Sequence, residues 1–513
     1  MSKRIVVNVG LLETRVAVQE GNLLTELYLE RHRHKSIVGS VYKGTVTNVL
    51  PGMQAAFVDI GLAKDAFLYA GDYTANLADV GRATLPDADE DADLDPDVDG
   101  DEEPKRQAAG PIEEMVSRGQ TLLVQVSKES LGTKGARITS FISLPGRYVV
   151  YMPQARHVGV SRRIRDERER DRLRAALRSL DLPPGGFIQR TNAEGKGEAE
   201  FAHDVAFLSR LWSQVQGRFE TAPAPAALHE EGDLTFRVVR DLFSPEVDEF
   251  VVDDRAVHDK VLGYVQTLVP ALADRVRLDR ERVPVFDAFG IEKDIEKALR
   301  RRVWLKSGGY IVIDHTEALV SIDVNTGKYV GKRDFEQTVL KINLEAVTEV
   351  VRQIRLRDLG GIIIIDFIDM EVLEHREQVY KAVKRALAED KARTNVLQIS
   401  ELGLVEMTRK RVRQDLRALL TQHCPTCRGT GVVKSNETLA TEIYRAVQAR
   451  AAAEAPPGEG REIVARVHPD LAAYLNAEGQ ADLERLEAAL EVKITVQAAP
   501  GLAQREEYEL KVR

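Results

Sequence analysis

Two short apolar runs in the second half of the chain each end in an acidic residue. Residues 318–323 and 362–366 are rich in β-branched side chains and are bounded by glycine or polar residues, which is typical of buried strands. Between them, residues 334–359 begin with a capping-box sequence and continue with apolar residues at helical spacing. A strand, a crossover helix and a second strand predict parallel neighbours whose carboxyl ends share one edge of a sheet. The apolar positions of the helix are Phe335, Val339, Ile342, Ala346, Val350 and Ile354.

The acids at the ends of these two strands, Asp323 and Asp366, are the first candidates for chemistry. If the strands are adjacent, the two residues lie about 5 Å apart, which is the spacing of neighbouring strands. Carboxylates that close repel each other unless a cation lies between them or one takes a proton. Mg²⁺ suits such a pair and leaves its other positions to water and substrate phosphate. The alternative is that these acids, like Asp369, merely end strands and begin turns.

Asn325 follows Asp323 by two residues, so while the strand persists its side chain points to the same face of the sheet. There it could hold a metal-bound water or a phosphate oxygen. The three residues together form the candidate catalytic group.

Apolar and polar residues alternate in the N-terminal part of the chain. Residues 5–9, 13–18 and 24–29 predict the start of a β-meander. Residues 39–69 predict short strands joined by glycine and proline turns, and residues 116–126 resume that pattern.

Helices are expected farther along the chain, at residues 166–179 and 437–454. The second helix leads into a linker rich in proline and glycine. Strands at 462–467 and 492–496 then predict a small α/β unit that closes the chain.

The chain has 513 residues, of which 43% are hydrophobic, so it should bury several cores in roughly three to four domains. No apolar run approaches the ~18 residues of a membrane span, and residues 5–9 are too short for a signal-peptide core. A cytoplasmic protein without a membrane partner is therefore expected. No Gly-x-x-x-x-Gly-Lys-Ser/Thr pattern occurs, so no nucleotide cofactor is expected.

The formal net charge of −9 is concentrated in one place. Eleven acids and no basic residue lie between Pro86 and Pro104, and without them 72 basic residues face 70 acidic ones. The remainder of the chain is thus mildly basic, which permits a polyanionic partner. Dense like charge predicts that the insert at residues 82–110 is a disordered surface loop, with mimicry of a nucleic acid as an alternative.

The only two cysteines, Cys424 and Cys427, are spaced Cys-x-x-Cys and followed by glycines. This spacing favours tetrahedral zinc, with a redox pair or unpaired buried thiols as the alternatives. One chain supplies half of a four-thiolate site, so two chains would share the ion.

Four motifs in this order resemble the ribonuclease E/G family over nearly the whole chain, and are closest to its ribonuclease G branch. They are Ser-Ile-Asp-Val-Asn-Thr-Gly, Leu-Arg-Asp-Leu-Gly-Gly-Ile-Ile-Ile-Ile-Asp-Phe-Ile-Asp-Met, Gly-Leu-Val-Glu-Met-Thr-Arg-Lys-Arg and Cys-Pro-Thr-Cys-Arg-Gly-Thr-Gly. The resemblance implies an endoribonuclease that cleaves single-stranded RNA by Mg²⁺-dependent hydrolysis and is stimulated by 5′-monophosphate ends. It also implies roles in rRNA 5′ maturation and mRNA decay. The rival classes are an RNA-binding scaffold without activity and a metal phosphatase.

The fold class implied by the resemblance is multidomain, α/β and all-β. The expected parts are a ribonuclease-H-like scaffold (1–35 and 235–298), an S1 barrel of OB type (36–141), a 5′-sensor region (142–234), a DNase-I-like α/β catalytic subdomain (299–400), a zinc link (401–431) and a small C-terminal α/β oligomerisation domain (432–513).

The resemblance also assigns residues. Asp323 and Asp366 match the family's Mg²⁺ ligands and Asn325 their support. Residues matched to RNA binding are Phe57, Phe67, Lys134 and Arg162, those matched to the 5′ phosphate are Arg190, Thr191 and Arg393, and those matched to zinc are Cys424 and Cys427. Core positions for the two phenylalanines and solvated arginines are the alternatives. The expected partners are rRNA precursors, mRNA and a second copy of the chain joined through zinc, with dimer or dimer of dimers left open.

Overall fold

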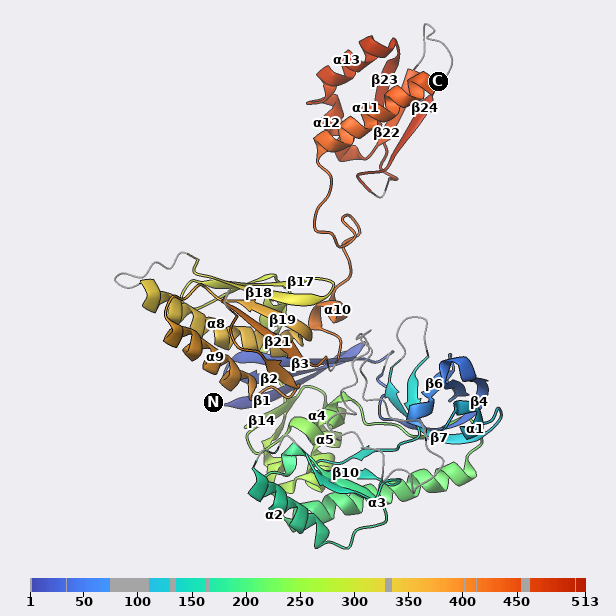
Figure 1. Cartoon of the computed structure of the whole chain (residues 1–513), viewed down its shortest axis with the longest axis vertical. Coiled ribbons are helices and arrows are strands. Elements are labelled where there is room, and N and C mark those ends of the chain that lie inside the picture. The colour runs from blue at the N-terminus through green and yellow to red at the C-terminus, as the bar shows by residue number, and fades with distance from the viewer. Residues whose placement is uncertain are drawn as a thin grey trace. The chain divides into compact units, whose positions relative to one another are not determined.

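The computed structural model describes residues 2–33, 35–73, 110–129, 135–161, 164, 166–327, 335–400, 403–411, 413–453, 462–502 and 504–513. The chain forms two compact units, Met1–Leu419 and Leu420–Arg513. The first contains four sheets and the second contains one (Figure 1). Nearly all of the acidic insert, along with Lys134 and Arg162, lies outside the described residues.

The first sheet joins the start of the chain to a segment about 240 residues later. Its strand order is β15-β14-β1-β2-β3. Strand β1 is antiparallel to β2 and parallel to β14, and the predicted meander is confirmed. The strands are β1 Lys3–Val9, β2 Glu13–Glu20, β3 Leu23–Arg31, β14 Glu249–Val252 and β15 Val276–Leu278, and the helices around them are α4 Leu234–Leu242, α5 Arg255–Leu268, α6 Val285–Ala288 and α7 Ile291–Ala298.

The second sheet is a closed barrel of five strands, because β4 pairs with both β5 and β7. Gly44 lies where β4 passes close to β5, since a Cβ there would stand 2.6 Å from a methyl group of Val58. Strand β13, Ala226–His229, adds to the outer edge of β4. The barrel elements are β4 Val41–Leu50, η1 Pro51–Met53, β5 Ala55–Asp59, β6 Ala66–Tyr69, η2 Ala70–Asp72, α1 Ile112–Met115, β7 Thr121–Lys128 and β8 Arg137–Thr139.

The third sheet, of order β11-β12-β10-β9, packs against two helices. Helix α2, Glu167–Arg178, confirms the predicted helix, and the side chain of Asp166 caps it by accepting from the backbone N–H of Arg168. The other elements are β9 Leu144–Pro145, β10 Val149–Met152, β11 Val158–Val160, β12 Gly186–Gln189, η4 Thr191–Ala193 and α3 Glu198–Thr221. The short helix η5, Pro270–Arg275, lies between α5 and β15 and packs in the core of the first sheet.

The fourth sheet carries the acidic strand ends and has the order β16-β17-β18-β19-β21-β20. Strands β18 and β19 are parallel and joined through helix α8, as predicted. The apolar residues that α8 was expected to bury are buried from Val339 to Ile354, and they pack with α9 on one face of the sheet (Figure 1). The elements are β16 Arg302–Trp304, β17 Tyr310–His315, β18 Leu319–Asn325, α8 Phe335–Arg357, β19 Gly361–Asp366, α9 Leu373–Leu387, β20 Thr394–Val396, β21 Leu404–Arg409 and α10 Leu416–Leu420.

A buried ion network joins the first and fourth sheets. Arg355 of α8 contacts Glu20 at 2.8 Å and Glu26 at 2.9 Å, and Lys391 contacts Glu26 at 3.1 Å. Burial alone would raise the pKa of Glu26, but Lys391 and Arg355 outweigh it and hold that pKa well below its usual range. The network therefore fixes α8 against strand β3.

The second unit is a small α/β domain whose sheet has the order β23-β22-β24. The predicted helix and both predicted strands are confirmed as α11 Asn436–Ala453, β22 Glu462–Val467 and β23 Lys493–Ala498. The remaining elements are α12 Pro469–Asn476, α13 Gln480–Leu490 and β24 Tyr508–Val512.

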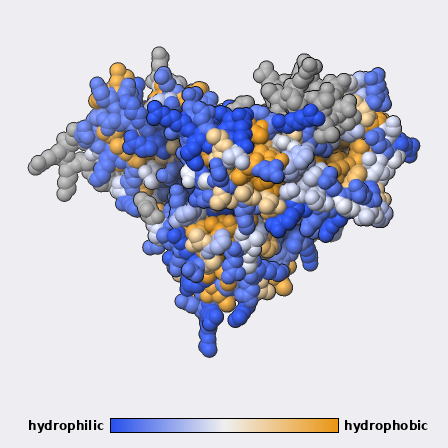
Figure 2. Space-filling model, turned by 90° about the horizontal axis from the view of Figure 1, so that it is seen from below, coloured by the Kyte–Doolittle hydropathy of each residue, from blue (hydrophilic) through white to orange (hydrophobic). Residues whose placement is uncertain are grey.

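On the face that Figure 2 shows, hydrophilic residues surround separate patches of apolar residues. Within the described part of the chain, every helix is too short or too polar to cross a membrane.

Candidate active site

The candidate site lies where β18 and β19 end side by side. Asp323 is the register partner of Asp366 in the parallel ladder, so the two carboxylates come from the same level of adjacent strands. Both residues are exposed, whereas their chain neighbours Ile322, Val324 and Ile365 face the buried core. The alternation of the strands thus turns the acids toward solvent, on the face of the sheet opposite α8 and α9.

Asn325 belongs to the same group, because its side-chain amide donates to Oδ2 of Asp323 at 2.7 Å. This hydrogen bond orients the Asp323 carboxylate and leaves its other oxygen for a ligand. The expected placement of Asn325 on the same face as Asp323 is therefore what the structure shows.

The electrostatics of the pair suit a hard cation. Partial burial and the nearby carboxylates of Asp323 and Asp369 raise the pKa of Asp366. Mutual repulsion of this kind is relieved by an ion bound between the acids. Among the described residues no group of three or more His, Cys, Asp or Glu side chains could hold a metal. The two carboxylates, with the amide of Asn325 beside them, form a group that fits Mg²⁺ with water and substrate completing its shell.

A residue that sequence reasoning missed supports the turn after β19. Asn343 of α8 is fully buried, and its amide donates to the carbonyl oxygen of Ile368 at 2.8 Å and accepts from the Ile368 N–H at 3.1 Å. These bonds fix the backbone between Asp366 and Asp369. The available signal was a lone amide beside Ile342, within the apolar stripe of an otherwise amphipathic helix.

The barrel presents an aromatic surface. Phe57 and Phe67 are cross-strand partners on β5 and β6, half-buried, with ring centroids 5.5 Å apart in an edge-to-face arrangement. Sequence reasoning missed Tyr69, which is 40% exposed, with its ring 4.4 Å from that of Phe67 and the Arg137 guanidinium 4.8 Å above it. The three rings and the cation make a surface of the kind on which nucleobases stack.

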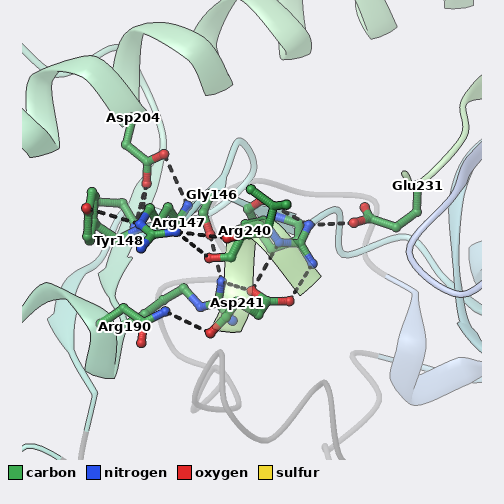
Figure 3. A network of polar contacts seen from close by, with 12 residues as sticks. Gly146, Arg147, Tyr148, Arg190, Asp204, Glu231, Arg240 and Asp241 are labelled. Atoms are coloured by element: carbon green, nitrogen blue, oxygen red, sulfur yellow. Dashed lines mark hydrogen bonds and ion pairs between the residues drawn. The ribbon is translucent and has the colours of Figure 1, made fainter. Parts of the chain in front are cut away.

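Arg190 directly follows β12 of the third sheet and is part of a polar network that reaches α4 (Figure 3). Its Nη1 donates at 2.7 Å to both the carbonyl oxygen of Gly146 and the carboxylate of Asp241. Arg240 also pairs with Asp241, at 3.0 Å. Although burial raises the pKa of Asp241, the two guanidinium groups hold it well below its usual range. The charge of Arg190 is thus partly balanced within the protein.

Thr191 follows Arg190 and begins a short 3₁₀ turn. Arg393 comes from a different part of the fold, directly before β20 in the fourth sheet, where it is exposed and its carbonyl oxygen accepts from the N–H of Lys410. The described contacts do not join Arg393 to Arg190.

The two cysteines lie at the start of the second unit in a turn-rich loop. Cys424 is exposed, Cys427 is half-buried, and both thiols are free. Thr430 donates its N–H and its hydroxyl to the carbonyl oxygen of Cys427. Hydrogen bonds from the backbone of Cys427 and Thr426 lower the pKa of the Cys424 thiol. A thiolate favoured in this way suits metal ligation and redox chemistry alike.

The protein is a multidomain α/β protein. It has an OB-type barrel with an aromatic surface, a mixed sheet with two carboxylates where two of its strands end, and a separate small α/β unit. The chain belongs to the ribonuclease E/G family: the model of that family matches residues 143–412, and the model of the RNase E/G thioredoxin-like domain matches residues 423–512.

Three relatives illustrate the match. The chain is 45% identical to ribonuclease G of Escherichia coli strain K12 over 447 residues, which cover 87% of this chain and 88% of that protein. Ribonuclease G of Haemophilus influenzae is 44% identical over 443 residues, 86% of each chain. Ribonuclease E of E. coli strain K12 is 36% identical over 489 residues, which cover 94% of this chain and 44% of that protein.

Proposed function

We propose that the protein is an endoribonuclease that cleaves single-stranded RNA by Mg²⁺-dependent phosphodiester hydrolysis. The observation that carries the proposal is the register of Asp323 with Asp366 at the ends of parallel strands. The relatives support it, since proteins named ribonuclease G and ribonuclease E align with most of this chain.

Asp323 and Asp366 would hold the ion, and Asn325 would keep the Asp323 carboxylate in position. A bound Mg²⁺ supplies polarisation of the phosphoryl group and a lower pKa for an attacking water. The chain's own contribution is to place two acids at one level of the sheet and, through Asn343, to fix the turn that follows Asp366.

The barrel surface is proposed to bind the RNA strand. Phe57 and Phe67 would stack on bases, and Lys134 and Arg162, which lie outside the described residues, would contact the backbone. The half-buried, edge-to-face geometry of the two rings supports this role, because each ring keeps part of its surface open.

Arg190, Thr191 and Arg393 are proposed to recognise a 5′ monophosphate and so to stimulate cleavage. The ion pair with Asp241 orients the Arg190 guanidinium for that purpose. The wider proposals are a cytoplasmic role in rRNA 5′ maturation and mRNA decay.

The domain assignments made from the resemblance are kept as proposals. The order β15-β14-β1-β2-β3, with β1 to β3 antiparallel and the others parallel to β1, supports a ribonuclease-H-like scaffold. The sheet covered by α8 and α9 on one face supports a DNase-I-like catalytic subdomain. Cys424 and Cys427 are proposed to share a structural zinc with the same pair of a second chain, forming a homodimer or a dimer of dimers.

The test uses purified protein and a 5′-monophosphorylated single-stranded oligoribonucleotide. Cleavage should require Mg²⁺, and Asp323→Asn or Asp366→Asn should slow it by about 10³-fold or more while RNA affinity persists. Asp314→Asn is the matched control, because Asp314 is an acid on β17 that pairs with Arg301 instead. Binding without any cleavage by the unmutated protein would favour a scaffold protein that has lost its chemistry.

A further inference from the structure

The open face of the fourth sheet carries an aromatic group close to the candidate active site. Trp304 of β16 is 62% exposed, although an indole is among the largest apolar side chains. Its ring centroid lies 5.3 Å from that of Tyr310 in an edge-to-face contact. An exposed tryptophan on the edge strand of a sheet can associate with other molecules. A ligand or partner that covers this indole is therefore expected.

The strand register connects these rings to the acidic pair. Trp304 is the partner of Tyr310, and Tyr310 is the partner of Asn325, so the three residues form one cross-strand row. The next row runs from Arg302 through Val312 to Asp323 and Asp366. Trp304 therefore lies two strands from Asn325, about 10 Å at the usual strand spacing.

Burial shows that these rows share the exposed face. Val303 and Ile311, which alternate with the row residues, are buried in the core formed with α8 and α9. Trp304 and Tyr310 consequently point away from the helices, to the side on which Asp323 and Asp366 are exposed.

A cation completes the group. The Arg302 guanidinium lies 4.4 Å from the ring centroid of Tyr310 and 5.8 Å from that of Trp304. Aromatic surfaces with an adjacent cation bind single-stranded nucleic acid, because the rings stack on bases while the cation attracts phosphate. The combination of rings, charge and nearness to the acids favours RNA over an apolar protein partner.

We propose that Arg302, Trp304 and Tyr310 form a stacking subsite for a nucleobase that lies near the scissile phosphate. The subsite is distinct from the aromatic surface of the barrel and rests on the proposed endoribonuclease function. It selects how the RNA enters the active site by holding one base beside the acids. Stacking of this kind accepts every base, so it positions the strand more than it reads sequence.

The first experiment measures cleavage of a single-stranded oligoribonucleotide with one cut site, and of a series in which one nucleotide at a time lacks its base. For the unmutated protein, removal of the base that stacks should lower kcat/KM by about tenfold. Trp304→Ala should lower kcat/KM on the intact oligonucleotide by a similar factor, mainly through KM, and should no longer respond to loss of that base. Trp304→Phe, which keeps a ring, should restore most of the rate.

Leu373→Ala is the matched control, because Leu373 is an exposed apolar residue at the start of α9, the helix on the opposite face of the sheet. It should leave the base-removal profile unchanged. A Trp304→Ala protein that cuts normally and keeps the full profile would overturn the subsite. If the unmutated protein cuts no oligonucleotide at all, the endoribonuclease proposal itself fails, so the two failures are distinguishable.

The second experiment needs no activity. The chain has two tryptophans, so Trp212→Phe leaves Trp304 as the only one. Titration with the same oligonucleotide in a chelator should quench its fluorescence if a base stacks on the indole, whereas Trp304→Phe, which retains Trp212, should show little change. Absence of quenching at saturating RNA would refute stacking. A change in the solution mass of Trp304→Ala would show instead that a second copy covers the surface, and would also overturn the proposal.

Discussion

Asn343 and Ile368 exchange two hydrogen bonds, at 2.8 and 3.1 Å, that join the middle of α8 to the backbone just beyond Asp366. Asn343 is fully buried and Ile368 is half-buried, so water replaces these bonds poorly if the amide is lost. The position of one candidate metal ligand thus depends on a residue that contacts neither metal nor RNA.

Asn343→Leu should lower both stability and activity. The two backbone groups of the half-buried Ile368 would lose their partners, at a cost of about 1 kcal/mol each. A shift of Asp366 by about 1 Å should reduce kcat by about 10²-fold. Urea unfolding and single-turnover cleavage measure the two effects. Val347→Ala, on the buried face of the same helix, should destabilise the protein yet keep its rate; equal losses of rate in both variants would assign Asn343 a purely structural role.

The barrel rings should contribute to RNA affinity. Phe57→Ala and Phe67→Ala should each weaken binding by about 1–3 kcal/mol, and Tyr69→Ala should act in the same direction. Fluorescence anisotropy with a labelled oligonucleotide measures the change. Phe289 is a suitable control, because it is also half-buried and lies beneath a guanidinium, that of Arg4, away from the barrel. Unchanged affinity in folded Phe57 and Phe67 variants would identify the rings as core.

Recognition of the 5′ end should appear as a preference for 5′-monophosphate over 5′-hydroxyl RNA. Arg190→Gln should erase that preference without lowering the rate on 5′-hydroxyl RNA, because the contact with phosphate charge is lost. The same change also removes the ion pair with Asp241 and the hydrogen bond to the Gly146 carbonyl oxygen, so it needs a control.

The ion pair with Asp241 supplies the control for the Arg190 experiment. Asp241→Asn breaks the same pair but keeps the guanidinium, so it should retain the preference. Arg393→Gln should behave like Arg190→Gln. If Asp241→Asn and Arg190→Gln prove indistinguishable, Arg190 acts through the fold alone.

Zinc content should follow the number of thiolates. A four-ligand site built from Cys424 and Cys427 of two chains binds about one zinc per two chains. Changing both cysteines to serine should release the metal and shift the protein toward smaller species in light scattering. One zinc per chain, or a monomer without zinc that forms a disulfide under mild oxidation, would refute the shared site.

The buried network around Glu26 should make stability depend on pH. The folded state lowers the pKa of Glu26, so its stabilisation is complete above the carboxyl group's ordinary value of 4.5 and is lost as the pH falls below it. Glu26→Gln removes one of the two carboxylates that Arg355 contacts, together with the partner of Lys391, and should cost about 3 kcal/mol at pH 7. The difference between the two proteins should shrink in unfolding curves below pH 4.5. Glu20→Gln should lower the free energy of unfolding by less, because Glu20 is more exposed than Glu26. If the difference between the Glu26→Gln protein and the unmutated protein does not change with pH, Glu26 is not ionised in the folded protein.

The acidic pair was predictable because its signal is local. A run of β-branched residues predicts each strand, and a helix that connects the two strands predicts that they are parallel neighbours. The proximity of Asp323 and Asp366 therefore follows from residues 318–366 alone. The helix beginning after Asp166 was predictable for the same reason, since cap and helix are adjacent in sequence.

Features that depend on distant partners were hidden. Strand β13 has four residues without clear alternation, and only the edge of β4 makes it a strand. The ion pair between Arg190 and Asp241 likewise joins residues that no local pattern relates. The same holds for the cross-strand row that contains Trp304, Tyr310 and Asn325. Asn343 was overlooked because a polar residue in an apolar stripe indicates no role by itself. Its role becomes clear only from its hydrogen bonds to the backbone of Ile368.

The pairing of β1 with β14 also has a consequence for the folding of the nascent chain during translation. Arg4 and its partner Glu249 are 245 positions apart. A ribosome that adds about 5–20 residues per second needs roughly 12–50 s to span that interval. The barrel strands are close together in sequence, so the barrel can close soon after they are synthesised. Strand β1 is synthesised before them, and its edge stays unpaired until β14 is made, which exposes it to pairing with other chains. Slower translation of residues 32–248 would lengthen that period, so the speed of synthesis, and the chaperones present during it, should influence how much of this protein escapes aggregation.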